Sequence, residues 1–211
     1  MLRSSKFRDI YFSAENGLAE TRHVFIDGTN LENRIKSNSH QVIAETGFGA
    51  GLNFLAVLEL LEKSGSDCRI DYISFEAYPL DATTAFEARK PFAELQNNSA
   101  QLKEVWPERW ACAHHRLFLQ DRVHLHLHFS DALVAMKQLD FKADVWFLDG
   151  FSPSKNTELW SEELFLQIAR LSAQNATISS FSVAALVKEG LIKAGFKLSL
   201  IHISEPTRLS G

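Results

Sequence analysis

The sequence predicts an α/β fold built on a doubly wound, mostly parallel sheet. Short strand patterns and helix patterns alternate from residue 41 onward, which is typical of right-handed βαβ units. A glycine-rich turn at residues 47–51 joins the first of these strands to the first helix. The chain has 211 residues, 45% of them hydrophobic and 23% charged, which is enough for one well-buried domain.

Each predicted element follows from a local pattern. Apolar runs or strict apolar–polar alternation predict strands, and apolar residues three and four apart predict helices. Gly65 and Gly195 follow two helix ends, Pro91 follows another, and Ser161 stands where a helix cap is expected. In order, we predict strand 41–45, helix 52–63, strand 69–75, helix 81–90, helical turns within 91–120, strand 123–129, helix 132–139, strand 144–148, helix 161–171, strand 177–181 and helix 184–194.

The first forty residues lack this alternation. Residues 9–13 and 23–28 each contain a short apolar run, and we expect a hairpin or small N-terminal β cap ahead of the sheet. We therefore divide the chain into a cap at residues 1–40, the sheet domain at 41–198 and a tail at 199–211.

Composition excludes several classes of protein. The apolar fraction is too high for a disordered chain, and no apolar stretch approaches the roughly 20 residues of a membrane span. No secretory signal pattern follows the N-terminus, and two cysteines cannot make a disulfide framework, so we expect a cytoplasmic protein. The net charge of −4 argues against binding nucleic acid by charge alone.

The strongest local signal is the segment at residues 45–53, which follows the first strand and opens the first helix. Ligands of open α/β sheets bind beyond the carboxyl ends of the strands, next to such a turn. Its G-x-G-x-G spacing differs from the G-x-G-x-x-G of dinucleotide-binding proteins. We expect these residues to hold a cofactor, with Thr46 adding a contact; the candidates are Glu45, Gly47, Phe48, Gly49, Gly51 and Asn53.

Acidic residues also stand at the ends of the following strands. Glu76 can accept hydrogen bonds from two ribose hydroxyls, which predicts a nucleoside-containing cofactor. Asp131 and Asp149 end two further strands, and with Glu45 they would place four acids along one sheet edge. Such an edge suits the sulfonium and ammonium of S-adenosylmethionine better than the pyrophosphate of NAD. Alternatively, Asp131 only caps the helix at residue 132.

Several motifs together resemble the methyltransferase domain of the bifunctional tRNA 5-methylaminomethyl-2-thiouridine biosynthesis proteins. The resemblance extends from about residue 9 to residue 196. The motifs are Tyr11-Phe12-Ser13, Asn16-Gly17-Leu18, Glu20-Thr21, the segment 45–53, Ser74-Phe75-Glu76, Pro79-Leu80, Trp146-Phe147-Leu148-Asp149-Gly150-Phe151-Ser152-Pro153, Lys155-Asn156, Trp160, Phe165, Ala169-Arg170-Leu171 and Thr177.

The resemblance implies a Rossmann-like class I S-adenosylmethionine-dependent methyltransferase. It implies methylation of the aminomethyl nitrogen of 5-aminomethyl-2-thiouridine at the tRNA wobble position, in the anticodon loop. The family often carries a fused FAD-dependent oxidoreductase domain, which we expect to be absent from this chain. After Phe196 the sequence departs from the family, so we expect 199–211 to be non-native and the last strands of the sheet to be missing.

Methyl transfer to an amine requires a neutral nitrogen held in line with the methyl group. We expect Asp149 to orient the aminomethyl group and help to take its proton, although it can equally serve the amino end of the cofactor. A base in a single-stranded loop can stack on aromatic faces. The expected substrate-binding residues are Tyr11, Phe12, Phe151 and Pro153.

His124, His126 and His128 alternate on one strand, which raises the possibility of a metal site. The outer pair is too far apart to share an ion, and no carboxylate lies between the three in the sequence. We therefore expect a polar strand face without a metal, and a loop at His114 and His115.

Three other functions remain open at this stage. The same fold carries small-molecule methyltransferases and aminopropyltransferases. An NAD-dependent oxidoreductase is disfavoured by the glycine spacing and the acids. A catalytically silent domain that only binds tRNA or a partner is disfavoured by the acidic net charge.

Overall fold

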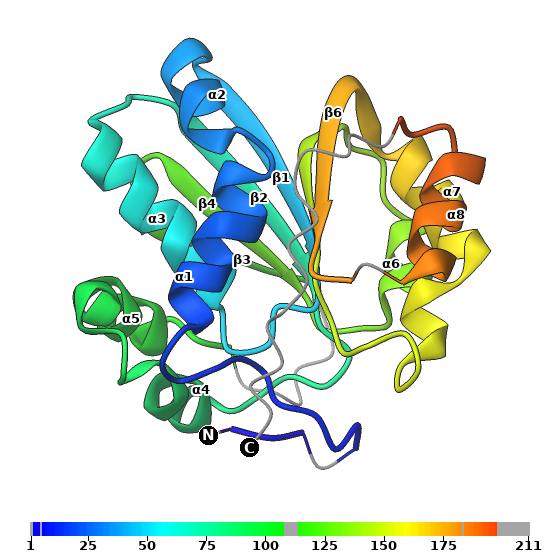
Figure 1. Ribbon diagram of the computed structural model, residues 1–211. Helices are drawn as coiled ribbons and strands as arrows, with labels where there is room; N and C mark the ends of the chain where they lie inside the picture. Colours follow the sequence, from blue (N-terminus) through cyan, green and yellow to red (C-terminus); the bar gives the residue numbers. More distant parts are fainter. Residues whose placement is uncertain (1, 5, 108–113, 183, 198–211) are drawn as a thin grey trace.

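The computed structural model describes residues 2–4, 6–107, 114–182 and 184–197 and shows one sheet with helices on both faces (Figure 1). Within these residues the sheet has six strands in the order β3-β4-β2-β1-β5-β6. All neighbouring strands are parallel except β3, which is antiparallel to β4. The strands are β1 (His40–Thr46), β2 (Arg69–Phe75), β3 (His114–Gln120), β4 (Val123–His128), β5 (Ala143–Leu148) and β6 (Ser172–Ser180).

The predicted doubly wound architecture is confirmed, and so is the predicted order of strands and helices from β1 onward, except for β3. Asp81 and Ser161 cap α4 and α7 by accepting hydrogen bonds from Thr84 N and Leu164 N. The helical segments are α1 (Gly17–Thr21), the π-helix η1 (Arg22–Asp27), α2 (Leu31–Ser37), α3 (Leu52–Ser64), α4 (Ala82–Arg89), η2 (Ala93–Leu95), α5 (Gln96–Glu104), α6 (Ala132–Met136), η3 (Thr157–Trp160), α7 (Glu162–Arg170) and α8 (Ala185–Lys193).

Two hydrophobic cores lie on opposite faces of the sheet. Helices α1, α2, α3 and α5 cover one face, where Phe54 of α3 packs on Tyr72 with ring centroids 5.1 Å apart. Helices α6, α7 and α8 cover the other face, around the fully buried Trp146 of β5. Because helices cover both faces of the sheet, a ligand site is expected at the carboxyl ends of its strands.

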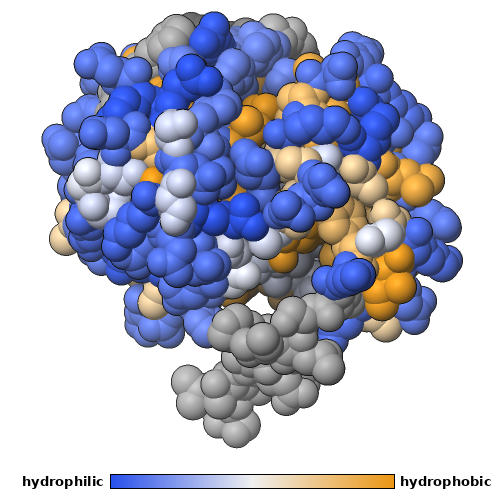
Figure 2. Space-filling model, turned by 90° about the horizontal axis from the view of Figure 1, so that it is seen from above, coloured by the Kyte–Doolittle hydropathy of each residue, from blue (hydrophilic) through white to orange (hydrophobic). Residues whose placement is uncertain are grey.

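The surface is mostly hydrophilic from above, with apolar surface gathered on the side of α7 and α8 (Figure 2). Leu166, Leu186 and Ile192 of these helices are at least half exposed. No helix in the described part of the chain combines the length and the apolar character that crossing a membrane requires.

The predicted N-terminal β cap is wrong, because residues 17–37 form helical turns. The described β structure of the cap is one isolated bridge between Arg3 and Ile10. Phe25 and Ile26 are neighbours in the sequence and both are buried, whereas a strand would point them to opposite sides. In the π-helix, Phe25 packs on Phe147 at a centroid distance of 4.9 Å, which anchors the cap on the sheet.

The predicted loop at His114 and His115 is also wrong, because both residues belong to β3. This edge strand pairs with β4 in a hairpin, with His115 opposite Leu127. The tail predicted at residues 199–211, and with it the expected loss of the last strands, lies outside the described residues.

Candidate functional site

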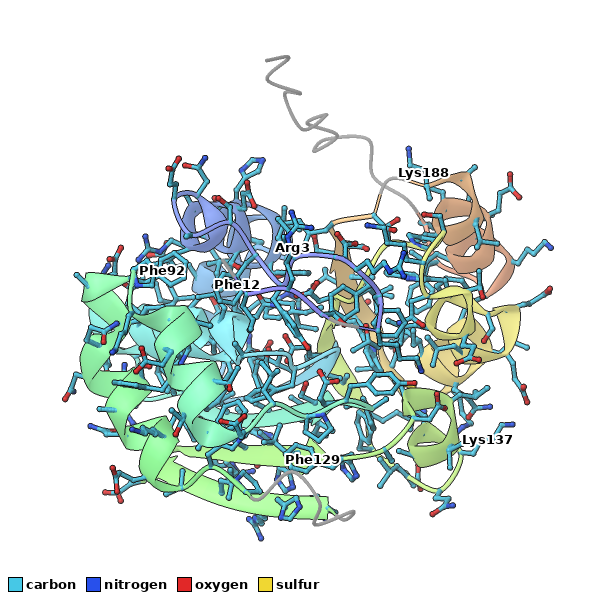
Figure 3. All side chains as sticks on the ribbon, turned by 90° about the horizontal axis from the view of Figure 1, so that it is seen from below. Arg3, Phe12, Phe92, Phe129, Lys137 and Lys188 are labelled. Carbon is cyan, nitrogen blue, oxygen red and sulfur yellow. The ribbon has the colours of Figure 1, made fainter. Side chains whose placement is uncertain are left out.

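A cavity of about 340 Å³ lies at the carboxyl ends of β1, β2, β4 and β5. The glycine turn after β1 lines it together with residues 7 and 10–13 of the cap. The N-terminal segment that carries Arg3 and Phe12 runs across this end of the sheet (Figure 3). The cavity is therefore enclosed between the sheet edge and the cap.

The glycine turn needs glycine for two separate reasons. Gly47, Gly49 and Gly51 have φ values of +80°, +54° and +78°, which side chains rarely adopt. A Cβ on Gly47 would also lie 3.1 Å from the carbonyl oxygen of Asp149. Phe48 points away from the turn into the core and packs on Trp106 with ring centroids 5.5 Å apart, while still lining the cavity.

Glu76 follows β2, and both of its carboxylate oxygens accept backbone hydrogen bonds. Gly49 N lies 2.8 Å from Oε2, and Tyr78 N lies 2.7 Å from Oε1. Burial raises the pKa of Glu76, and these two hydrogen bonds oppose that rise. The carboxylate therefore joins the glycine turn to the end of β2, and Glu76 lines the cavity. Its binding of ribose hydroxyls stays a prediction.

Asn53 holds two of the predicted acids together. Its Nδ2 donates to Glu45 Oε1 at 2.8 Å and to Asp149 Oδ2 at 2.7 Å, so both of its N–H groups are used. The Thr21 hydroxyl donates to Asn53 Oδ1 at 2.9 Å, which fixes the orientation of the amide. Thr46 Oγ1 donates to the Asp149 carbonyl oxygen at 2.8 Å and positions the strand end that carries this acid.

The two bridged acids differ in environment and in proton affinity. Burial raises the pKa of Asp149 to about 6, while hydrogen bonds from Asn53 and Gly150 N limit the rise. Burial raises the pKa of Glu45 to about 8; a hydrogen bond from Ser74 opposes the rise, and the nearby charge of Asp149 adds to it. Near pH 7, Asp149 is therefore ionised and Glu45 is protonated.

The expectation that four acids line one crevice holds for three of them. Glu76, Asp131 and Asp149 line the cavity. Glu45 does not, because its carboxyl group is turned beneath the surface towards Asn53 and Ser74, with only 1% of the residue exposed. Glu45 thus contacts the site through Asn53.

Asp131 caps α6 and also lies at the cavity. Its Oδ1 accepts a hydrogen bond from Val134 N at 3.0 Å, so it does cap α6. The same residue lines the cavity beside Ser130 and Ala132. Its second oxygen remains available for a donor such as an exocyclic amino group.

Aromatic side chains border the cavity on the cap side. Tyr11 and Phe151 meet edge to face with centroids 5.2 Å apart, and Phe7 stacks on Phe151 at 4.7 Å. Burial raises the pKa of Tyr11 to about 12, with a further rise from the charge of Glu76. Phe12 lies beside Phe92, with centroids 5.6 Å apart (Figure 3). These rings all line the cavity except Phe92, and Pro153 lies outside it as well.

Phe7, Thr21 and Arg89 line or support the site but were not selected as site residues from the sequence. Phe7 has no local signal, because only the folded cap brings it to Phe151. Thr21 stands in one of the motifs quoted above, so its selection was possible. Arg89 is fully buried in α4 and donates to the Ala50 carbonyl oxygen, which supports the glycine turn from below.

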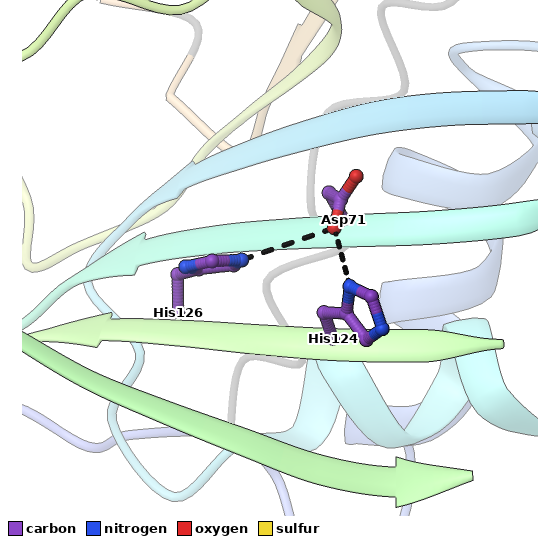
Figure 4. Close-up of side chains that lie close together, drawn as sticks. All are labelled: Asp71, His124 and His126. Atoms are coloured by element: carbon purple, nitrogen blue, oxygen red, sulfur yellow. Dashed lines mark hydrogen bonds and ion pairs between the residues drawn. The ribbon is translucent and has the colours of Figure 1, made fainter. Parts of the chain in front are cut away.

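One further group of side chains has ligand atoms within reach of one another. Asp71, His124 and His126 lie together on the face of β2 and β4, with ligand atoms all within 4.8 Å (Figure 4). The strand that carries the histidines has no carboxylate between them, but the neighbouring β2 places Asp71 beside them. Within the described residues, this group is separate from those lining the cavity.

The chain is similar to several known proteins. A family model described as S-adenosyl-L-methionine-dependent methyltransferase matches residues 93–203. Two similar relatives are named tRNA 5-methylaminomethyl-2-thiouridine biosynthesis bifunctional protein MnmC. The one from Magnetococcus marinus is 44% identical over 92% of this chain, and the one from Aeromonas hydrophila is 43% identical over 99%. The chain spans only 29% and 33% of their lengths.

A solved structure is also similar to this fold. The crystal structure of MNMC2 from Aquifex aeolicus matches with a TM-score of 0.77 at 26% sequence identity. The match covers 92% of this chain and 60% of that one.

Proposed function

The chain belongs to the family of S-adenosyl-L-methionine-dependent methyltransferases, and from this premise we propose that it methylates the aminomethyl nitrogen of 5-aminomethyl-2-thiouridine at the wobble position of tRNA. The observation that carries the proposal is the position of Asp149 at the cavity wall, where Asn53 holds its carboxylate near the aromatic rings of the cap. The names of the 44% and 43% identical relatives supply the substrate.

The residues present fit S-adenosylmethionine. Its sulfonium supplies an activated methyl group, so the protein needs no metal ion or covalent intermediate for the transfer. A donor with two positive groups is favoured by a cavity bordered by the buried Glu76 and the partly buried Asp149, because hydrogen bonds hold both carboxylates in place. The bare glycine turn lets a ligand approach the backbone closely.

Asp149 is proposed to act on the amine. An aminomethyl group is mostly protonated near neutral pH, and only the neutral amine is nucleophilic. The carboxylate can accept a hydrogen bond from the amine, orient it and help to take its proton. Because the pKa of Asp149 is about 6, the group is ionised and able to accept at pH 7.

The aromatic cap is proposed to hold the base. Tyr11 and Phe151 present ring faces and edges at the cavity, and a base splayed out of an anticodon loop stacks on such rings. Phe12 lines the cavity beside Phe92, and Pro153 would contribute from outside the cavity. Stacking together with the Asp149 contact would select an aminomethylated pyrimidine.

The proposal also includes a second enzymatic domain and a cellular compartment. The relatives are named bifunctional and are about three times as long as this chain, so an FAD-dependent oxidoreductase domain is proposed to act with this activity. A tRNA substrate also implies a cytoplasmic protein.

The direct test is transfer of a labelled methyl group from S-adenosylmethionine to tRNA isolated from cells that lack this modification. Digestion to nucleosides should place the label on the wobble uridine. Label on polyamines or other small amines but not on tRNA would replace the proposal with a small-molecule transferase.

Asp149→Asn separates the two roles considered for this residue. We expect S-adenosylmethionine binding to be largely kept and methyl transfer to fall by about a hundredfold or more, the scale of general base catalysis. Loss of binding in calorimetry would instead assign Asp149 to the amino end of the cofactor. Asp140→Asn is the matched control, because Asp140 is exposed and lies outside the residues that line the cavity, and its turnover should stay close to that of the wild type.

A further inference from the structure

We propose that Asp71, His124 and His126 form a binding site for one divalent transition-metal ion of the Zn²⁺ class. The site lies on the face of the sheet, on β2 and β4, outside the residues that line the cavity (Figure 4). Two imidazoles and one carboxylate are a common ligand set for such ions. The proposal is independent of the methyl-transfer activity.

The sheet itself sets the spacing of the ligands. His124 and His126 are two residues apart on β4, so both point to the same face, and Asp71 lies directly opposite His124 in the parallel register. Asp71 Oδ1 is 2.9 Å from His124 Nδ1 and 3.8 Å from His126 Nε2. Ligand atoms around a tetrahedral Zn²⁺ lie about 3.3 Å apart, so small side-chain rotations would complete the geometry.

Each ligand is already oriented by a second contact. The other oxygen of Asp71, Oδ2, lies 2.6 Å from His40 Nε2, and the other nitrogen of His126, Nδ1, lies 3.0 Å from His114 Nε2. Metal-binding histidines and carboxylates typically have such outer partners, which fix the ring orientation and increase the affinity. Four strands, β1 to β4, thus contribute to the group.

The partial burial of the ligands favours metal binding. The side chains of Asp71, His124 and His126 are 22%, 18% and 20% exposed, so they are held in place yet reachable from solvent.

Two neighbouring cations, Arg69 and Arg116, oppose the ion. Arg69 Nε of β2 lies 3.8 Å from Asp71 Oδ2. Arg116 Nη2 of β3 lies 3.3 Å from His124 Nδ1, the atom that would bind the metal. Arg116 is exposed, so its long side chain can move when an ion binds. Removing its charge should therefore increase the affinity rather than reduce it.

A bound ion would link β2 to β4 at a distance from the cavity. Asp71 and Glu76 are five residues apart, which corresponds to roughly 17 Å along an extended chain. Metal binding should therefore raise the melting temperature of the protein without changing its affinity for S-adenosylmethionine.

The test is titration of the untagged, chelator-treated chain with Zn²⁺ by calorimetry, with Co²⁺ absorption as a second readout. We expect one ion per chain, nitrogen-ligand bands with Co²⁺, and a Zn²⁺-dependent rise in melting temperature. His126→Gln and Asp71→Asn should each weaken binding about tenfold or more, and the double variant should abolish it. Arg116→Gln should bind equally well or more tightly.

His23→Gln is the matched control, because His23 lies in the cap, outside the group. Binding of S-adenosylmethionine by each variant shows that it is folded. If the double variant fails to fold, the Zn²⁺ affinity of His126→Gln alone tests the proposal. A wild-type titration indistinguishable from that of His126→Gln, or a tenfold loss in His23→Gln, would overturn the proposal.

Discussion

The substitution Glu45→Gln tests how protonation of the buried Glu45 changes the stability of the protein with pH. The pKa of the fully buried Glu45 is raised from 4.5 to about 8, so the folded protein keeps a proton that the unfolded chain releases. Stability is therefore greatest below the unfolded pKa and falls as the pH rises towards 8. The slope is about 1.4 kcal/mol per pH unit. The amide introduced by Glu45→Gln is neutral at every pH and can still accept from Asn53 and donate to Ser74.

The clearest window lies between pH 6 and 8, above the pKa of about 6 of Asp149. Across it, the wild type should lose about 2 kcal/mol more of its unfolding free energy than Glu45→Gln, because the slope declines as the pH reaches the folded pKa. Urea unfolding at pH 6, 7 and 8 measures this difference, because other titrating groups are common to both proteins. Glu104→Gln, at an exposed position near the end of α5, should run parallel to the wild type. Parallel curves for Glu45→Gln would refute the reasoning.

Three further substitutions test separate parts of the site. Gly47→Ala should lower the unfolding free energy by about 1–2 kcal/mol, because φ is +80° at this position, and it should also weaken the binding of S-adenosylmethionine. Unchanged urea unfolding and unchanged binding in calorimetry would contradict this prediction. Asn53→Ala removes a hydrogen bond that lowers the pKa of Asp149, so the acidic limb of the rate–pH profile should move above about 6; an unmoved limb would contradict this. Phe151→Ala should raise the KM for tRNA about fivefold or more while leaving cofactor affinity unchanged, and an unchanged KM in steady-state assays would exclude base stacking there.

The core of the site could be predicted because its signals are local. The strand, the glycine turn and the helix that follow one another through residues 40–64 are contiguous in the sequence. Glu76 and Asp149 follow buried strands, and parallel strand ends meet at one edge of a sheet. The same reasoning placed Glu45 at the edge, but it could not tell that its side chain turns inward to Asn53.

The remaining features depend on contacts between distant segments. Residues 23–28 form too short an apolar run to separate strand from helix, and the choice depends on Phe25 reaching Phe147. Asp71 and His124 are 53 residues apart, and only the pairing of β2 with β4 brings them together. No local pattern contains that information.

The central claim is that the cavity between the glycine turn, Glu76 and Asp149 holds the positively charged methyl donor. A crystal structure with S-adenosylmethionine bound tests it most directly. The account predicts ribose hydroxyls at the Glu76 carboxylate and the donor's charged end on the side of Asp149. A donor seated away from these two carboxylates, or one that does not bind to the folded protein, would contradict it.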